Sequence, residues 1–412
     1  MPTPSIQSHP APGPLAAAAV FLAGVCAFLQ LYCTQPLLPL FTSIFHVTKA
    51  SAGLTVSAAT IAVALSAPFF GALTERLARR RVILASILGM AIPTLLAATA
   101  QTLTQLIVWR FLQGVMVPGV VAVLVTYIGE EWPPNRVPFI MSLYVSGTAL
   151  GGFLGRLTAG FLADWFSWRA SFLALGLASF AGAAAVAAWL PHGRPRPHSH
   201  QPKPDFFRQL RTLFRLPRLV ATFAVGFNVL FSLVAVFTWI TFHLADPPFS
   251  LSTAALSSLF FVYLVGLLVT PVAGYLITRT GLRTGIAAAM LLSMLGVLLT
   301  LAPSLAVVLL GLAMVCSGVF IAQTASQSFL RIATPPESRV TGAGLYMSCY
   351  YFGGTAAGVV PAIFWSIGKW PACVAFILFA QSVALTIALF GWRTRAPQPT
   401  DNPAYPQPAN LE

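Results

Sequence analysis

Charged residues are scarce in this chain: Asp, Glu, Lys and Arg together make up 8% of its 412 residues, against 57% hydrophobic residues. A water-soluble domain carries roughly a quarter charged residues, so this composition excludes an ordinary soluble fold. The chain must therefore lie largely in lipid or in a lipid-facing helical bundle.

Acidic residues are the scarcest charged group. None of the nine lies in the central part of a long apolar run; they stand at the ends of runs, in loops or in tails, as Glu75, Glu130, Glu131, Asp164, Asp205, Asp246, Glu337, Asp401 and Glu412. Buried carboxylates and histidines are the usual proton relays inside a membrane. Their absence weighs against any mechanism that needs such a relay.

Motifs for catalysis, metal binding and redox chemistry are also missing. The cysteines all lie inside apolar runs without metal or redox spacing, so we interpret them as packing residues: Cys26, Cys33, Cys316, Cys349 and Cys373. The sequence has no nucleotide-binding loop and no combination of nucleophile, base and metal ligands. We therefore predict that the protein is not an enzyme, binds no metal and needs no cofactor.

The net charge of +14 at pH 7 would suit a nucleic-acid-binding protein. The basic residues, however, stand in short clusters between apolar runs and form no stripe interleaved with aromatic residues. Such clusters are typical of the loops that orient a membrane protein. The partner we expect is a lipid bilayer, with no nucleic acid.

Apolar runs of roughly 20 residues, the length that one membrane-spanning helix needs, recur along the chain. We predict twelve spans, at 15–36, 51–72, 82–101, 105–128, 138–162, 170–190, 219–242, 254–277, 285–302, 305–330, 340–365 and 371–391. They predict an N-terminal tail (1–14), a six-helix bundle (15–190), a central loop (191–218), a second six-helix bundle (219–391) and a C-terminal tail (392–412). The predicted fold class is an all-α integral membrane protein.

Basic residues also predict the orientation. With the N-terminus in the cytoplasm, 18 of the 23 Lys and Arg residues fall inside and only Lys49, Arg169 and Lys369 fall outside. Arg110 and Arg156 complete the count and lie within spans. This bias follows the positive-inside rule, so both termini should be cytoplasmic.

The two halves carry one ten-residue signature, about 203 positions apart and each time between two apolar runs. The first copy contains Gly71, Leu73, Glu75, Arg76, Arg79 and Arg80; the second contains Gly274, Leu276, Arg279 and Arg283. Such self-similarity indicates a duplicated unit. Duplicated membrane halves with a path between them are the plan of many secondary transporters.

The acid of the first signature suggests a gate. A carboxylate near a helix N-terminus is stabilised by the helix dipole, and breaking such a contact when two bundles rock would give a two-state element. We expect the motif to act as this gate. The alternative is that its arginines only set the topology.

This signature resembles the loop motif of the major facilitator superfamily, with Glu75 where the family usually has Asp. Arg110-Phe-Leu-Gln113-Gly114 is similar to the family's fourth-helix motif, and the glycines that end at Gly155 resemble the fifth-helix motif of its antiporters. Together with Tyr32 and the residues after it, the pattern resembles the bacterial drug- and sugar-efflux branch. The resemblance implies twelve helices in two pseudo-symmetric bundles, in the bacterial cytoplasmic (inner) membrane.

Arg110 and Arg156 are the first candidates for a functional site, because an arginine inside a membrane is costly. Counted by helical rise, each lies roughly 8–9 Å below the outer end of its span. We expect Arg110, with Gln113 one turn below it, to relay protons or to hold substrate, unless it only bonds neighbouring carbonyls. Arg156 suits an anionic or carbonyl-rich group, unless it snorkels outward or pairs with Asp164.

Other polar and aromatic residues in the spans are further candidates. We expect a path lined by Tyr32, Gln35, Tyr144, Trp239, Tyr263, Gln323, Tyr346 and Tyr350. Glycines expected to pack helices closely are Gly114, Gly147, Gly151, Gly152, Gly155, Gly354 and Gly358. Glu130, at the inner end of the fourth span, is the one nearby acid that could couple to protons.

The function predicted from these features is a secondary transporter that works by alternating access. By resemblance, it would export a small organic molecule as a monomer while protons enter, with the proton gradient as its energy source. One alternative is an organic-anion exchanger or uniporter that uses Arg110 and Arg156 as binding charge. A second alternative is a membrane sensor that transports nothing, although the loops are too short to hold a signalling domain.

Overall fold

The computed structural model describes residues 12–191, 206–335 and 338–392. Most of the two predicted tails and of the central loop lies outside these ranges. Helices make up most of the described ranges, and no β-strand occurs in them. The all-α fold predicted from the composition is confirmed.

The first half forms seven α-helices with one short 3₁₀ turn, η1 (Gln35–Leu37). They are α1 (Pro14–Leu29), α2 (Leu38–Ile44), α3 (Lys49–Arg76), α4 (Arg79–Ala97), α5 (Leu103–Glu131), α6 (Val137–Trp165) and α7 (Trp168–Trp189). Local signals set several of their starts. The Thr102 and Ser167 hydroxyls accept hydrogen bonds from the backbone N–H groups of Gln105 and Ala170, and so cap α5 and α7.

The second half begins with a short helix that lies within the predicted central loop. Its elements are α8 (Phe206–Phe214), α9 (Pro217–Ala245), α10 (Thr253–Ser258), η2 (Leu259–Phe261), α11 (Val262–Thr280), α12 (Leu282–Leu299), α13 (Leu305–Ala333), α14 (Arg339–Val359) and α15 (Pro361–Gly391). Within α15 the backbone leaves helical geometry at Gly368 and Lys369, so its first turns belong with α14. The remainder coincides with the last predicted span.

Nine of the described helices are long and apolar enough to cross a membrane alone. The places of the other three predicted spans are taken by α14 and by two shorter apolar helices, Pro14–Leu29 and Thr253–Gly266, which α2 and α11 continue. The halves repeat at the predicted interval: α4 corresponds to α12, and α5 to α13. Two six-helix bundles related by pseudo-symmetry result.

The first span is not the single helix predicted for 15–36. Helix α1 ends at Leu29, residues 30–34 form turns, and the helix resumes through η1 and α2. Pro36 and Pro39 are the second residues of η1 and α2, within the first turn, where proline is tolerated, so both lie at helix starts. The crossing is therefore a broken helix whose break presents side chains and carbonyls.

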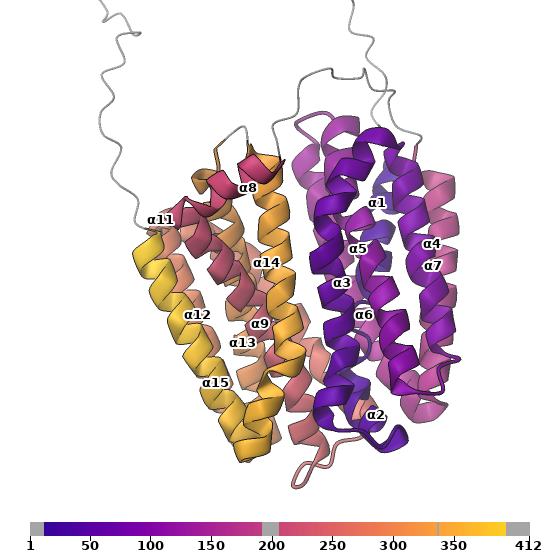
Figure 1. The fold of residues 1–412 in the computed structure, drawn as a ribbon, viewed down its shortest axis with the longest axis vertical. Coiled ribbons are helices and arrows are strands. Elements are labelled where there is room, and N and C mark those ends of the chain that lie inside the picture. The colour runs from indigo at the N-terminus through magenta and orange to yellow at the C-terminus, as the bar shows by residue number, and fades with distance from the viewer. Residues whose placement is uncertain (1–11, 192–205, 336–337, 393–412) are drawn as a thin grey trace, which may run out of the picture.

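The two bundles lie side by side, with α8 at one end of the molecule and α2 at the other (Figure 1). We name these ends after the orientation predicted from the charges: α8 marks the inner end and α2 the outer end. The contacts between the bundles described in the next section lie in the outer half of the molecule.

Candidate functional site

The bundles meet closely where α3 crosses α14 near the outer end. The Ser57 hydroxyl donates a 2.7 Å hydrogen bond to the backbone oxygen of Thr355. A Cβ atom built on Gly53 would collide with the Gly358 carbonyl oxygen, and one on Gly358 would collide with the Ser57 hydroxyl. Glycine is therefore required here for the two helices to approach.

An ion pair closes the same side at the surface. The Lys49 ammonium, at the start of α3, lies 2.7 Å from an oxygen of Asp246 after α9. It also lies 4.3 Å from the ring centroid of Trp365. All these contacts join the first half to the second.

Beneath this closure, the broken first span brings Gln35 between the halves. The amide nitrogen of Gln35 donates to the Thr238 hydroxyl on α9 at 3.0 Å, and its oxygen accepts from Arg156 Nε on α6 at 2.7 Å. Gln35 and Thr238 are both fully buried. One amide thus bridges the two bundles and holds the arginine.

Arg156 is 3% exposed and stands inside an aromatic cage. Its guanidinium carbon lies 4.7 Å from the ring centroid of Tyr32, 4.9 Å from that of Phe260 and 4.8 Å from that of Tyr263. Its Nη1 donates to the Gly152 carbonyl at 2.6 Å. We call Arg156, Tyr32, Gln35, Thr238, Phe260 and Tyr263 the Arg156 cluster; it draws on both halves.

The environment of Arg156 differs from the two alternatives considered for it. It is buried rather than extended to the outer surface. Its ion-pair partner is not Asp164: among the described residues Arg156 forms no ion pair, and Asp164 is exposed at the end of α6.

Arg110 is fully buried, and every described partner belongs to the first bundle. Its guanidinium donates to the backbone oxygens of Gln30 at 2.6 Å and Thr55 at 3.1 Å, and also to that of Leu31 and to the Gln113 amide oxygen. The break after α1 leaves carbonyls without helical partners, and Arg110 supplies donors to them. This arginine holds the broken helix in shape.

Gln113 extends this arrangement into a buried polar network. Its amide nitrogen donates to the Thr94 hydroxyl at 2.6 Å, and that hydroxyl contacts the Gln30 amide, which in turn contacts Ser179. The network joins four helices of one bundle. Gln113 therefore lies with Arg110 rather than with the Arg156 cluster.

The second half supplies most of the predicted aromatic residues. Tyr263 packs on Arg156, and its hydroxyl is buried without a hydrogen-bond partner. The rings of Tyr346 and Tyr350 stack with centroids 6.1 Å apart, and the Tyr350 ring lies edge-on to that of Tyr351. Both Tyr346 and Tyr350 belong to α14, the helix that packs against α3 of the first bundle.

Three other predicted residues lie away from the guanidinium. The Trp239 indole donates to the Ala357 carbonyl at 3.0 Å, which makes it a packing contact between α9 and α14. Tyr144 is buried on α6 against α1, where its backbone oxygen lies close to Gly24. Gln323 is half-buried on α13, without a described contact to the cluster.

Glycines on α6 lie directly against the carbonyls of α1. A Cβ on Gly147, Gly151 or Gly155 would collide with the carbonyl oxygens of Phe21, Val25 and Leu29 respectively. The glycine spacing therefore fixes how α6 presents Arg156 to the break. Gly114 similarly faces Ala59, Gly354 faces Leu230, and Gly152 faces only Arg156 and Phe28.

At the inner end, the duplicated signature ties helices together. Arg80 Nε donates to the Leu190 carbonyl at 2.7 Å, and its counterpart Arg283 donates to the Leu389 carbonyl at 2.6 Å. Both carbonyls end a helix, so the paired arginines satisfy orphan groups at equivalent places. Arg79 lies 2.7 Å from an oxygen of Glu130, the proposed coupling acid.

The rest of the proposed gate is only partly described. The structure does not describe the surroundings of five of its residues, Gly71, Leu73, Glu75, Arg76 and Leu276. A Cβ on Gly274 would meet nothing within 4 Å, so that glycine makes no close approach here. Arg279 is exposed over the ring of Tyr275, 4.6 Å from its centroid.

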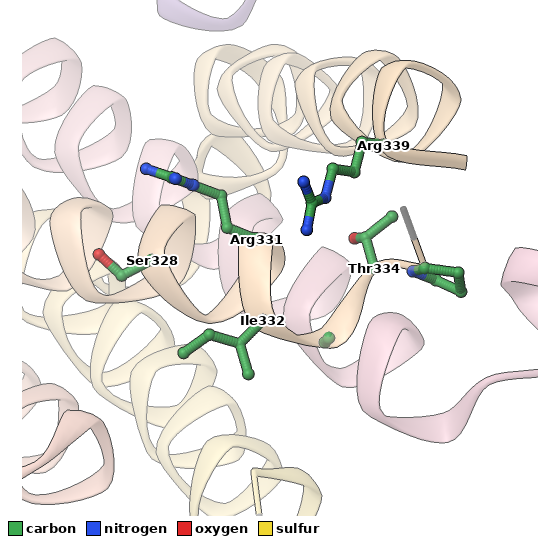
Figure 2. A pocket seen from close by; sticks show the side chains of 7 residues that line it. Ser328, Arg331, Ile332, Thr334 and Arg339 are labelled. Atoms are coloured by element: carbon green, nitrogen blue, oxygen red, sulfur yellow. The ribbon is translucent and has the colours of Figure 1, made fainter. Parts of the chain in front are cut away.

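A cavity of about 640 Å³ opens at the inner end of the second bundle. Figure 2 shows Arg331 on α13, Arg339 at the start of α14 and Thr334 on the segment between them. A second cavity of about 560 Å³ shares Ser328 and Ile332 with it. Neither is lined by the Arg156 cluster, and within the described ranges no three His, Cys, Asp or Glu residues group as metal ligands.

Sequence reasoning missed two residues of the Arg156 cluster, Thr238 and Phe260, and the ion pair of Lys49 with Asp246. One signal was available. Gln35 and Thr238 are 203 positions apart, the interval of the duplicated signature, so they are equivalent positions of the two halves. Equivalent residues that lie near a pseudo-two-fold axis face each other, and the repeat could have paired them.

The fold and this site define a class: an integral membrane protein of two pseudo-symmetric six-helix bundles with a buried cation where they meet. A family model described as Major Facilitator Superfamily matches residues 20–358. The chain belongs to this superfamily, as its loop and fourth-helix motifs predicted.

Bacterial relatives align with nearly its full length. The inner membrane transport protein YnfM of Escherichia coli (strain K12) is 34% identical over 374 residues, 90% of this chain and 88% of the relative. An uncharacterized transporter of Buchnera aphidicola subsp. Schizaphis graminum (strain Sg) is 32% identical over 373 residues, 90% of this chain and 89% of the relative. The protein is thus a multi-pass membrane transporter of this superfamily.

Solved structures share the fold at low sequence identity. An inward-facing, unoccupied bacterial homolog of the human lysosomal transporter Spinster has a TM-score of 0.75 at 16% identity, covering 92% of this chain and 97% of that chain. The human organic anion transporter MFSD10 has a TM-score of 0.69 at 19% identity, covering 91% of this chain and 99% of that chain. At these identities the likeness concerns the fold alone.

Proposed function

We propose that this chain is a secondary active transporter that moves a small organic solute by alternating access, with the Arg156 cluster as its solute site. The observation that carries the proposal is the bridge from Arg156 through Gln35 to Thr238, which joins the two bundles. A solute held there would contact both halves. Binding would therefore change how the halves pack against each other.

The outer closure is built from contacts that can separate. It consists of small residues, single hydroxyl bonds and one partly exposed ion pair, Lys49 with Asp246. Exposed ion pairs contribute only about 0–1 kcal/mol. The ion pair therefore adds little to the free energy needed to open the outer side.

For the direction and energy source, we propose export from a bacterial cytoplasmic membrane, with both termini in the cytoplasm, driven by proton entry. Support comes from the relatives' bacterial origin, the inner membrane named for one of them, and the glycine series on α6 that resembles the antiporter motif. Glu130 is the proposed coupling acid. Its ion pair with Arg79 at the inner end gives it a partner that protonation would release.

An exchanger or uniporter for organic anions is a second candidate. It is favoured because the described acids all stand at helix ends or in loops, which leaves no described carboxylate to relay protons through the centre. For this candidate, collapse of the proton gradient would leave counterflow unchanged.

The test is flux into liposomes that contain only this protein. Transport of members of a panel of small organic compounds, accelerated by an inside-acidic gradient and lost in Glu130→Gln, supports proton-driven export. Asp164→Asn, which neutralises an exposed outer acid, is the matched control and should transport normally. Flux indifferent to pH and to Glu130→Gln would overturn the proton coupling, and absence of any flux would overturn transport.

A further inference from the structure

The Arg156 cluster offers hydrogen-bond donors in excess of acceptors. A guanidinium carries five N–H donors. Two of them are used, toward Gln35 and Gly152, and no described residue accepts from the other three. Aromatic faces attract the cation but provide no oxygen to these N–H groups.

The tyrosine beside the guanidinium adds another unused donor. The Tyr263 hydroxyl is buried and has no hydrogen-bond partner, although its ring lies 4.8 Å from the Arg156 guanidinium carbon. Buried polar groups in proteins are almost always paired. An orphan hydroxyl on a ring that packs against a guanidinium with unused N–H groups indicates a missing acceptor.

The charge of the site is also unbalanced. Arg156 forms no ion pair among the described residues, and the described acids stand at helix ends or in loops. A buried charge without a counterion is unfavourable, so an anion that entered would gain both hydrogen bonds and charge pairing. Arg110 differs in this respect, because backbone carbonyls of its own bundle accept hydrogen bonds from its guanidinium.

The walls of the site are apolar and largely aromatic. Phe260 and Tyr263 pack together with centroids 5.7 Å apart, and Phe320 lies 5.8 Å from Tyr263. Flat rings gain from stacking against such walls. The site thus surrounds a guanidinium with aromatic rings, on which the aromatic body of a solute would stack once the bundles part.

We propose that the transported solute is an aromatic organic anion whose carboxylate, or equivalent oxyanion, accepts hydrogen bonds from Arg156 and from the Tyr263 hydroxyl. This inference rests on the proposed function, since it names the substrate class of the same site. Carboxylates match guanidinium geometry in two parallel hydrogen bonds. Arg156 would bind the anion, and Gln35 would position Arg156.

The test uses 2-naphthoate and its neutral counterpart 2-naphthamide on purified protein. We expect 2-naphthoate to raise the unfolding temperature while 2-naphthamide does not. Arg156→Gln should weaken naphthoate binding about tenfold or more, as the loss of a charged hydrogen bond predicts. Arg169→Gln, which removes an exposed outer arginine, should leave binding unchanged.

Tyr263→Phe separates ligand binding from a structural role. Removing a hydroxyl without a partner should leave the unfolding temperature of the free protein unchanged or raised, yet weaken naphthoate binding several-fold. Unchanged naphthoate binding in Tyr263→Phe would remove the hydroxyl from the proposal.

Failure of the substrate class differs from failure of the function. Three results would overturn the proposal that the solute is an anion. They are equal stabilisation by naphthoate and naphthamide, no stabilisation by naphthoate, and undiminished naphthoate binding by Arg156→Gln. Flux of a neutral compound through Arg156→Gln at the wild-type rate would also overturn it, while leaving alternating-access transport intact.

Discussion

Arg110 and Arg156 are both buried in the membrane interior, yet their surroundings differ in kind. Arg110 donates to three backbone oxygens and one amide within the first bundle. Arg156 has two such bonds, and its remaining contacts are ring faces from both bundles. Burial of a cation therefore does not by itself indicate a binding site. Hydrogen-bond donors left unused where the two bundles meet do indicate one.

The largest expected effect is a difference in stability between the two arginines. Arg110→Gln should reduce the free energy of unfolding by several kcal/mol, because each buried carbonyl left without its donor costs about 1–3 kcal/mol. Arg156→Gln should change it far less. Unfolding temperature and the monodisperse fraction in detergent measure both variants, and equal losses would refute the distinction.

The glycine contact that sets the position of Arg156 should have the next largest effect. Gly155→Ala places a methyl group against the Leu29 carbonyl, and overpacking of this kind costs about 1–3 kcal/mol. Gly129→Ala on α5 is the matched control, because a Cβ there meets nothing within 4 Å. The control should be neutral or stabilising by up to about 1 kcal/mol; a similar loss in both variants would contradict the packing.

Gly358→Val tests the closure above the Arg156 cluster. The larger side chain should prevent α14 from approaching α3 and so favour a conformation open on the outer side. Labelling of a cysteine at position 238 by a membrane-impermeant reagent from outside should become several-fold faster. Gly344→Val, on the same helix with nothing within 4 Å, should leave the labelling rate at that of the parent.

Lys49→Gln should have the smallest effect. Its ion pair with Asp246 is partly exposed, with side chains 29% and 51% accessible, so the pair contributes at most about 1 kcal/mol. The ratio of open to closed outer side should therefore rise no more than about fivefold. High salt should reproduce the effect in the parent protein, and salt independence would show that the pair does not hold the closure.

Much of the fold could be predicted because helix length and apolar composition are strong constraints in a membrane. The spans, the repeat and the importance of both arginines came from those signals. The break at residues 30–34 had one sequence signal, Pro36, which has no N–H to donate to the Tyr32 carbonyl four residues earlier. The partner that stabilises the break could not be predicted, because Arg110 donates to the Gln30 carbonyl from 80 positions away along the chain.

The site itself was predictable only in part. Tyr32, Gln35, Arg156 and Tyr263 were named as candidates, but Gln113 and Arg110 form a separate network. That separation depends on which face of each helix turns to the other bundle. Sequence spacing gives the depth of a residue along its helix, whereas packing against neighbouring helices decides which way its side chain points.

Accessibility of position 238 from each side of the membrane tests the central claim most directly. Thr238→Cys, in a background with Cys349→Ser, is labelled by an impermeant maleimide in inside-out and right-side-out vesicles, with and without Gly358→Val. Alternating access around the Arg156 cluster predicts that position 238, which is buried beneath the outer closure in the parent, is labelled from outside once that closure is blocked. A cysteine at 238 that reacts from neither side in either protein would contradict the account.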